Sequence, residues 1–496
     1  MQKEILHPAQ RLYNLRNSLG LSQRELAKEF MVSSGAIASW EIAANPIPGP
    51  VIKLIELYEN SLSHQRDSNE EFVGEVDEIL QKINFTQSDK EQLNQIFKNF
   101  IIDEKNLNSL KAKTKLSLIK QILNLLKDSR GATIKFVQLL SYLEVGLPSE
   151  IRNVLGNIQN KLKPLNKNTV NSIVENSYGK SIHEVFSFFD YKPLAVTSLA
   201  QVHYAKLKNG QEVAVKIQDP EIKKTLKKQF DKINFLSKIG AFFNNDLVGI
   251  VKEIQKTLEF ECDYKREVET HIKIKEILKD MPRVYVPNVY LNLCTSNIIV
   301  TEFIHGENFH AFSARANQES KNLVATAITR SLTHLAFSHN LVYTDAHFEN
   351  FLIKNDKIVI LDFGRTFSPD RERMRLEIMF YRAFVRGQKE IAQKIFQKIG
   401  FVKNEKDFNF DEFWIFLTNS SKHLLHQGKF KFTKNYLQEI SREGRRFSQK
   451  KNMKLSPEVF WGFTFSSGTW ALFAELEAEI NWNQIALETF DTALQF

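Results

Sequence analysis

The chain has 496 residues, 43% of them hydrophobic and 25% charged, a composition that suits about two to four globular domains. Its two cysteines, Cys262 and Cys294, exclude a disulfide framework and an all-cysteine zinc site. A net charge of +9 is small for this length and does not by itself indicate a nucleic-acid or membrane partner. The first residues lack the apolar core of a signal peptide, and no apolar stretch is long enough to span a membrane. We therefore expect a cytoplasmic protein without a transmembrane segment.

The positive charge lies outside the N-terminal fifth of the chain. Residues 1–100 contain ten Lys or Arg and fourteen Asp or Glu, a net charge of −4, which leaves +13 for the rest. A dense basic stretch with interleaved aromatic residues covers residues 429–454. It indicates either a solvated helix face, which we favour, or a peripheral contact with an anionic surface such as lipid headgroups or nucleic acid.

The first sixty residues contain short helices joined by a tight turn. Ser22 and Glu25 form a capping box at the start of one helix, and Ser33 begins the next after a break at residues 30–32. The segment resembles the Cro/repressor-type (XRE-like) helix-turn-helix family over about residues 8–60.

This resemblance implies DNA contacts by Gln23 and by exposed residues of the second helix, such as Ser34 and Ser39. The exposed residues of that helix are small, however, and bidentate recognition of bases requires longer side chains. Residues 1–60 also carry six basic and six acidic residues, so their attraction to phosphates is weak. DNA binding and a protein-contact or dimerisation role therefore both stay open.

A hairpin pattern surrounds Lys216. Two alternating strands flank an Asn-Gly turn, and in the second strand three apolar residues share one face while Lys216 lies on the other. A lysine among apolar strand residues needs an anionic partner. The Val-Ala-Val-Lys pattern is that of the kinase strand whose lysine binds the α- and β-phosphates of a nucleotide.

A second pattern combines Asp345, Asn350 and the triplet Asp-Phe-Gly that begins at Asp362. The residues between them predict a hairpin whose paired residue numbers sum to about 711, which places Asn350 opposite Leu361 and next to Asp362. An amide oxygen and a carboxylate oxygen side by side suit Mg²⁺, which accepts few protein ligands. Asp345, on the preceding loop, is placed to orient or deprotonate a nucleophile.

Two further elements complete the candidate site. We expect Glu261, Asp263 and Glu267 on one helix after the hairpin, with Glu267 as the partner of the strand lysine. An apolar strand then leads into a polar connector, and the backbone groups from Glu302 to Ile304 are candidates for binding adenine.

These patterns resemble the UbiB/AarF family of atypical kinase-like proteins over about residues 110–390. The resemblance rests on the blocks KFVQLLSYLEVGLPSEI, PLAVTSLAQVHYAKLKNGQEVAVKI, EFECDYKREVE, and LVYTDAHFENFLI with ILDFG. It implies a helix over the active site in which Lys135 and Gln138 face Glu261 and Asp263. It also implies that an alanine-rich loop replaces the glycine-rich loop over the phosphates, here with the nucleotide-binding candidates Ala195, Thr197, Ser198 and Ala200.

The chain departs from the family pattern in two places. Val137 replaces the glycine of the K-x-G-Q helix, and residues 343–350 read Tyr-Thr-Asp-Ala-His-Phe-Glu-Asn where the family has His-Ala-Asp-Pro-His-Pro-Gly-Asn. The lysine, the helix glutamate and the Asp, Asn and Asp of the second pattern are all retained, so we expect binding of ATP or ADP with Mg²⁺. The resemblance implies an atypical kinase-like ATPase or phosphotransferase linked to quinone or lipid metabolism, with a lipid or quinone precursor as a candidate substrate.

The expected fold is α+β: a two-lobed protein-kinase-like fold with a helical N-terminal extension, plus a small all-α helix-turn-helix domain. Two alternative functions stay open. One is a nucleotide-sensing pseudokinase that regulates through a DNA-binding helix-turn-helix; the other is a small-molecule phosphotransferase, against which the K-x-x-Q and E-x-D elements argue. The expected boundaries are 1–62 for the helix-turn-helix domain, 63–110 for a polar helical linker, 111–190 for the helical extension, 191–305 for the N-lobe and 306–496 for the C-lobe.

Overall fold

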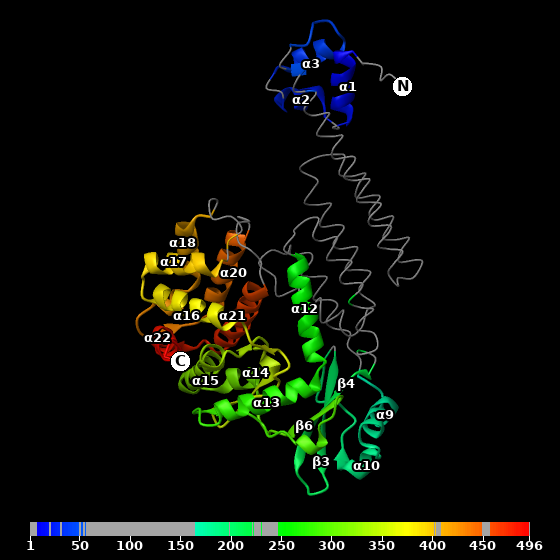
Figure 1. Ribbon diagram of the computed structural model, residues 1–496, viewed down its shortest axis with the longest axis vertical. Helices are drawn as coiled ribbons and strands as arrows, with labels where there is room; N and C mark the ends of the chain where they lie inside the picture. Colours follow the sequence, from blue (N-terminus) through cyan, green and yellow to red (C-terminus); the bar gives the residue numbers. More distant parts are fainter. Residues whose placement is uncertain are drawn as a thin grey trace. The chain divides into compact units, whose positions relative to one another are not determined.

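The structure is a computed structural model with two compact units, of which the first contains the described residues up to 55 and the second those from 164 onward. Figure 1 colours the N-terminal unit blue and the second unit from cyan to red. The described residues are 7–18, 21–29, 32–48, 51–52, 55, 164–197, 199–220, 222, 230, 247–400, 402, 408–448 and 457–495.

The N-terminal unit places three short helices around a small apolar core. They are α1 (Pro8–Ser18), α2 (Gln23–Glu29) and α3 (Ser34–Glu41). The predicted caps are confirmed: the Ser22 N–H donates to the Glu25 carboxylate at 2.8 Å, and the Ala36 N–H donates to Ser33 Oγ at 3.2 Å. The buried core residues of this unit are Leu12, Leu15, Leu26, Ala27, Ile37, Trp40 and Ile55.

A carboxylate at the end of α3 ties the three helices together. Glu41, whose side chain is 4% exposed, accepts hydrogen bonds from Arg16 Nε of α1 at 2.5 Å and from Gln23 Nε2 of α2 at 2.7 Å. Ser39 Oγ accepts from the Asn45 side chain at 2.6 Å, whereas Ser34 is exposed at the start of α3. Two of the three residues predicted to contact DNA thus already have side-chain partners inside this unit.

The described part of the second unit begins with helices that pack on an antiparallel sheet. The sheet order is β1-β3-β4-β6, with β2 paired to β3. Gly210 closes the predicted β3–β4 hairpin with a φ of 84°, a conformation that favours glycine, and the paired strands confirm the hairpin. The elements are α9 (Lys167–Tyr178), α10 (Ile182–Val185), β1 (Phe186–Phe189), β2 (Ala195–Val196), β3 (Ala200–Leu207), β4 (Glu212–Gln218) and β6 (Ile298–Glu302).

Two separate helices follow the hairpin, where a single one was expected to carry Glu261, Asp263 and Glu267. Helix α12 (Leu247–Glu261) ends at the first of these residues, and α13 (Tyr264–Leu278) begins after the second. Asp263 has non-helical backbone angles (φ −95°, ψ 86°), and its side chain accepts a hydrogen bond from the Arg266 N–H at 3.1 Å. The prediction of one helix is therefore wrong, because Asp263 acts as an N-cap and divides the segment.

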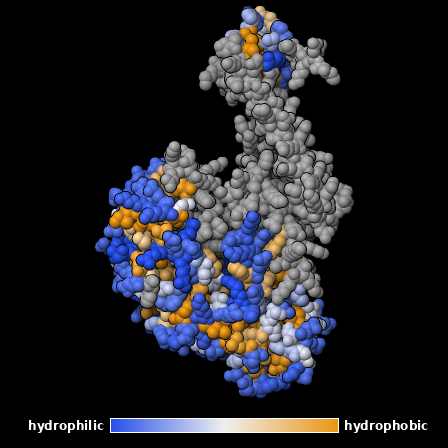
Figure 2. Space-filling view, viewed as in Figure 1, coloured by the Kyte–Doolittle hydropathy of each residue, from blue (hydrophilic) through white to orange (hydrophobic). Residues whose placement is uncertain are grey.

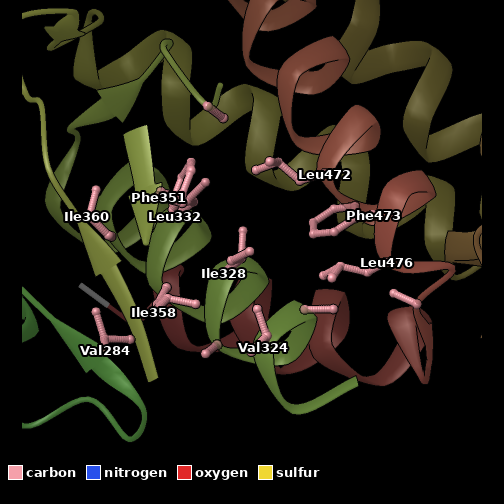
Figure 3. Close-up of a cluster of buried hydrophobic side chains, with 14 of the residues drawn as sticks. Val284, Val324, Ile328, Leu332, Phe351, Ile358, Ile360, Leu472, Phe473 and Leu476 are labelled. Atoms are coloured by element: carbon pink, nitrogen blue, oxygen red, sulfur yellow. The ribbon is translucent and has the colours of Figure 1, made fainter. Parts of the chain in front are cut away.

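The remaining part is mostly helical around a second sheet with the order β5-β10-β9-β7. Pairing of Lys357 with Lys354 and of Ile360 with Phe351 confirms the predicted register of the β9–β10 hairpin. In the close-up of Figure 3, side chains of α15 lie between this hairpin and α21. The elements are β5 (Val284–Tyr285), a 3-10 turn (Leu291–Leu293), β7 (Glu307–Asn308), α14 (Phe309–Arg315), α15 (Gln318–Thr333), a π-helical turn (His334–Ser338), β8 (Val342–Tyr343), a second 3-10 turn (Phe348–Asn350), β9 (Phe351–Lys354), β10 (Lys357–Ile360), β11 (Thr366–Phe367), α16 (Arg371–Val385), α17 (Lys389–Ile399), α18 (Phe410–Ser420), α19 (Lys422–Leu425), β12 (Phe430–Lys431), α20 (Lys434–Ser448), α21 (Pro457–Leu476), β13 (Glu479–Ile480) and α22 (Trp482–Ala493).

The described part of the basic stretch, residues 429–448, contains the short strand β12 and the amphipathic helix α20. Its apolar side contributes Tyr436 and Ile440 to the core, while Lys434 pairs with Glu475 at 2.9 Å. Figure 2 shows hydrophilic and hydrophobic residues interspersed on the visible face of this unit. Among the described residues, none of the helices combines the length and apolar character needed to cross a bilayer. These observations favour the solvated-face interpretation, and a contact of residues 429–454 with an anionic surface stays a prediction.

The Glu41 network generates a stability prediction. In E41A, Arg16 loses the carboxylate that pairs with it, and breaking such a mostly buried pair costs about 3 kcal/mol. We therefore expect the backbone amides of α1, α2 and α3 to exchange faster in full-length E41A, by the factor that corresponds to this loss of stability. R24A changes an exposed position of α2 and is expected to leave the exchange rates unchanged. Equal exchange in E41A and the wild type would contradict the assigned role of Glu41.

Candidate active site

Lys216 lies at the centre of a partly buried ion cluster. The neighbouring strand residues Val215 and Ile217 face the apolar core, so alternation turns the lysine to the opposite face of the sheet. There its Nζ atom donates to Glu267 Oε1 at 2.7 Å and to Asp362 Oδ2 at 2.8 Å. The structure thus brings together three residues that the sequence analysis placed on three separate elements.

The break between α12 and α13 separates the acidic residues into two groups. Glu267, in the first turn of α13, contacts Lys216, whereas Glu261, at the end of α12, lies 3.6 Å from the Arg365 Nε atom. Asp263 is exposed and caps α13. The E-x-D pair therefore does not form one acidic surface with Glu267, as a single helix would require.

The β9–β10 hairpin places Asn350 and Asp362 at its open end. The Leu361 N–H donates to the Asn350 carbonyl at 3.1 Å, which continues the predicted pairing one step beyond the strands. Asp362 Oδ1 accepts from the Gly364 N–H at 2.9 Å. The Asn350 side-chain amide donates to the Asp345 carbonyl at 2.9 Å and to Asp345 Oδ2 at 3.0 Å.

Asp345 is held from a second side by Arg365, a residue that the sequence analysis did not identify. Arg365 Nη1 donates to Asp345 Oδ1. The arginine directly follows the Asp-Phe-Gly triplet, and its side chain is 2% exposed. Its place next to the triplet was the signal available in the sequence, but only the fold shows that the guanidinium reaches both Asp345 and Glu261.

Among the described residues, this cluster concentrates ionisable groups of both signs. The carboxylates of Glu261, Glu267, Asp345 and Asp362 meet the cations Lys216 and Arg365. The Arg266 guanidinium lies beside the same segment, on the Gly364 and Thr366 carbonyls. The protonation state of each carboxyl group therefore depends on its neighbours as well as on its burial.

The pKa values in this cluster are shifted by burial and by the neighbouring charges. Burial raises the pKa of Glu267 to about 7, with Lys216 opposing the shift and Asp362 adding to it. Burial alone would lower the pKa of Lys216, but the two carboxylates outweigh it and raise that pKa well above its ordinary value. For Asp362, burial raises the pKa, and the charge and hydrogen bond of Lys216 reverse this to a net lowering.

The alanine-rich segment forms a tight turn between β2 and β3. Ala195 pairs with Val202, and Thr197 Oγ1 accepts from the Ala200 N–H at 3.0 Å. The Thr197 hydroxyl therefore stabilises the turn itself. Ser198 lies outside the described residues, as do Lys135 and Gln138 of the covering helix.

The connector after β6 is held within the N-lobe. The Glu302 N–H donates to the Asn288 carbonyl at 2.8 Å, and the Glu302 carboxylate accepts from the Tyr285 hydroxyl at 2.7 Å. The Phe303 N–H donates to the Glu212 carbonyl at 3.1 Å. Ile304 is buried at the end of this connector. The N–H groups of residues 302 and 303 are thus engaged in the protein, and adenine binding by Glu302 and Ile304 stays a prediction.

The raised pKa of Glu267 predicts a pH dependence of stability. The folded-state pKa of Glu267 lies above the ordinary value of 4.5. The neutral carboxyl group therefore contributes its whole stabilisation below pH 4.5, and this contribution is lost as the pH rises to about 7. The stability of the wild type relative to E267Q should therefore fall across this range, by on the order of 3 kcal/mol. Urea unfolding at several pH values measures it, and a difference that stays constant would contradict the shift.

Comparison with known families agrees with this geometry. Residues 157–395 match the ABC1 atypical kinase-like domain, and residues 12–64 match a helix-turn-helix domain. A solved structure of the complex of Rv3197 with erythromycin from Mycobacterium tuberculosis has a TM-score of 0.54 at 21% identity, over 76% of this chain and 96% of that one. This likeness concerns the fold.

Curated proteins with related sequences cover the same region. The atypical kinase COQ8 of Saccharomyces cerevisiae is 32% identical over 261 residues, which are 51% of this chain and 52% of the relative. AarF domain-containing protein kinase 1 of Xenopus laevis is 27% identical over 303 residues, 59% and 58% of the two chains. Probable protein kinase UbiB of Pseudomonas fluorescens is 32% identical over 235 residues, 46% and 44%. The chain thus spans about half the length of the curated relatives it matches.

The expected fold is therefore confirmed, with an α+β kinase-like domain and an all-α N-terminal domain. The chain carries an ABC1 atypical kinase-like domain, similar to those of the COQ8 and UbiB proteins, together with an N-terminal helix-turn-helix domain.

Proposed function

We propose that the kinase-like domain binds ATP with Mg²⁺ and acts as an atypical kinase or ATPase. The observation that carries this proposal is the ion cluster, in which Lys216 contacts both Glu267 and Asp362. A lysine fixed by a helix glutamate next to a metal-binding aspartate is the arrangement that kinases use to hold nucleotide phosphates. The relatives bear the name kinase, which suggests phosphoryl chemistry, and the resemblance to the UbiB/AarF family suggests quinone or lipid metabolism with a lipid or quinone precursor as substrate.

The donor set fits a magnesium ion. Asn350 and Asp362 supply an amide and a carboxylate oxygen, which are ligands of the kind that Mg²⁺ prefers. Among the described residues, no group of three or more His, Cys, Asp and Glu side chains could hold a metal. Two protein ligands combined with phosphate oxygens are typical of Mg²⁺, which would neutralise the phosphate charge that develops during transfer.

The protein groups have separable tasks. Lys216 binds phosphate oxygens while Glu267 keeps its side chain extended from β4. Asp345, oriented by Asn350 and Arg365, accepts the proton of the attacking hydroxyl or water. Asp362 is held by the Gly364 N–H, which leaves its second oxygen directed at the cation position where Lys216 Nζ lies in this structure.

Residues 344–347 form the loop after β8 that carries Asp345, which we call the catalytic loop, and helix α21 positions it. Gly468 lies so close to this loop that a Cβ atom there would be 2.8 Å from the Ala346 carbonyl oxygen and 3.3 Å from its Cβ. Ala346 directly follows Asp345, so any shift of its backbone moves the proton acceptor. A Cβ at Gly462 of the same helix would meet nothing within 4 Å.

The helix-turn-helix domain supports a second candidate function, control of transcription by a nucleotide-sensing kinase-like domain. Its match over residues 12–64 favours this role. Gln23 is bound to Glu41, however, and the exposed start of α3 carries only small side chains such as Ser34. DNA selection with the full-length chain at two salt concentrations would test it, since phosphate contacts make binding salt-dependent. A third candidate, phosphorylation of a small aminoglycoside- or choline-like molecule, shares the same aspartates.

The first test concerns the metal ligand. In D362N we expect Mg²⁺ to lose its effect on ATP affinity, with an increase of about tenfold in the dissociation constant, because the carboxylate oxygen for the cation is removed. D356N, in the turn of the same hairpin where asparagine is tolerated at φ 55°, is the matched control and binds as the wild type does. Titration calorimetry with and without Mg²⁺ measures both, and absence of ATP binding by the wild type would refute the proposal.

The second test concerns the catalytic loop. In G468A the new methyl group must displace Ala346, so we expect turnover to fall about 10- to 100-fold with little change in ATP affinity. In G462A the methyl group meets open space, and turnover stays near the wild-type value. Steady-state kinetics of the two variants checks this, and equal rates would show that α21 does not position the loop.

A further inference from the structure

Arg365 connects two acidic elements that are far apart in the sequence. Its Nη1 atom donates to Asp345 Oδ1, and its Nε atom lies 3.6 Å from Glu261 Oε1. One carboxylate belongs to the catalytic loop and the other to the end of α12. With 2% of its side chain exposed, the guanidinium lies beneath the site rather than facing a substrate.

The backbone around Arg365 is fixed to the catalytic loop. The Thr344 N–H and Thr344 Oγ1 both donate to the Arg365 carbonyl, at 3.0 and 2.8 Å. Tyr343 of β8 pairs with Thr366 of β11 one position further on. Residue 365 is therefore a neighbour of residue 344 through the main chain, and its side chain needs no long reach to contact Asp345.

Helix α13 holds the same segment from the other side. Arg266 Nη1 donates to the Gly364 carbonyl at 3.4 Å and Nη2 donates to the Thr366 carbonyl at 2.5 Å. These two carbonyls flank Arg365. The next residue of α13 is Glu267, the partner of Lys216. One turn of α13 thus orients both the lysine and the segment that carries Arg365.

Arg365 supplies positive charge to both Asp345 and Glu261, and the Asn350 amide adds a second donor to Asp345. A partly buried carboxylate is stabilised by such a cation and such donors. The five N–H donors of arginine lie in one rigid plane and fix the direction of each contact. The three donors of a lysine ammonium can also meet two carboxylates, as Lys216 does, but they leave from a single rotatable atom and do not fix the same directions.

We propose that Arg365 is a positioning residue that fixes the orientation of Asp345 and couples it to Glu261, so that the end of α12 and the catalytic loop move as one element. The expected change in turnover rests on the proposed kinase or ATPase function. The expected change in the mobility of the loop does not. Glu261 acts through Arg365: it aligns the guanidinium, which in turn aligns Asp345.

The test compares full-length wild type, R365A, R365K and E261Q with R330A as control, since Arg330 pairs with Glu488 at an exposed site. Hydrogen exchange without nucleotide is followed in residues 342–350, and ATP turnover is measured with Mg²⁺. In R365A we expect exchange of the loop to rise about tenfold and kcat to fall about 10- to 100-fold, with KM for ATP changed by less than about threefold. R330A leaves both unchanged.

The two other variants separate positioning from general stability. R365K keeps the charge and is expected to lose less kcat than R365A, while loop exchange stays above that of the wild type. E261Q is expected to lower kcat by a smaller factor, and the double variant R365A/E261Q to be no slower than R365A, because both changes break one chain of contacts.

Several outcomes would overturn the proposal. They are unchanged loop exchange in R365A or R365K, an exchange increase spread evenly over the kinase-like domain, or independent effects of R365A and E261Q that multiply. If the wild type shows no ATP turnover, the proposed function fails, and loop exchange in R365A and R365K still decides the role of Arg365.

Discussion

The ion cluster of Lys216 is the interaction on which the rest of the kinase-like domain depends. A lysine in the middle of a sheet is stable away from water only if carboxylates meet it. The two that do so come from α13 and from the end of the β9–β10 hairpin. Strand, helix and hairpin therefore have to be placed together, and displacement of any one of them removes at least one ion pair from the partly buried cluster.

The break between α12 and α13 follows from the same constraint. A continuous helix would place Glu261 and Glu267 about a turn and a half apart on one rod. The cap at Asp263 instead ends one helix and restarts another, so that each glutamate meets its own cation. The two helices thereby divide the acidic charge between Lys216 and Arg365.

Local features of the fold could be predicted from the sequence, and long-range ion pairs could not. Register of the β9–β10 hairpin and the cap at Ser33 followed from turn residues and alternation, which act over a few residues. The cap at Asp263 was missed because helical periodicity continues on both sides of it. Arg365 was missed because no local rule links residues 261, 345 and 365; their proximity arises only when the two β hairpins and α12 are packed.

In the helix-turn-helix domain, hydrogen bonds within the domain engage side chains that could otherwise contact DNA. Glu41 draws Arg16 and Gln23 toward the core of the domain, and these are long polar side chains of the kind that contact phosphates and bases in DNA-binding proteins. With Gln23 so engaged and α3 beginning in small residues, sequence-specific readout of the major groove has few side chains available. The exposed apolar residue Ile42 directly follows α3, and single exposed apolar residues are found on ordinary surfaces as well as at protein contacts. The hydrogen bonds of Glu41 therefore reduce the side chains available for reading bases, while the choice between DNA binding and protein contact depends on the remaining surface of the domain.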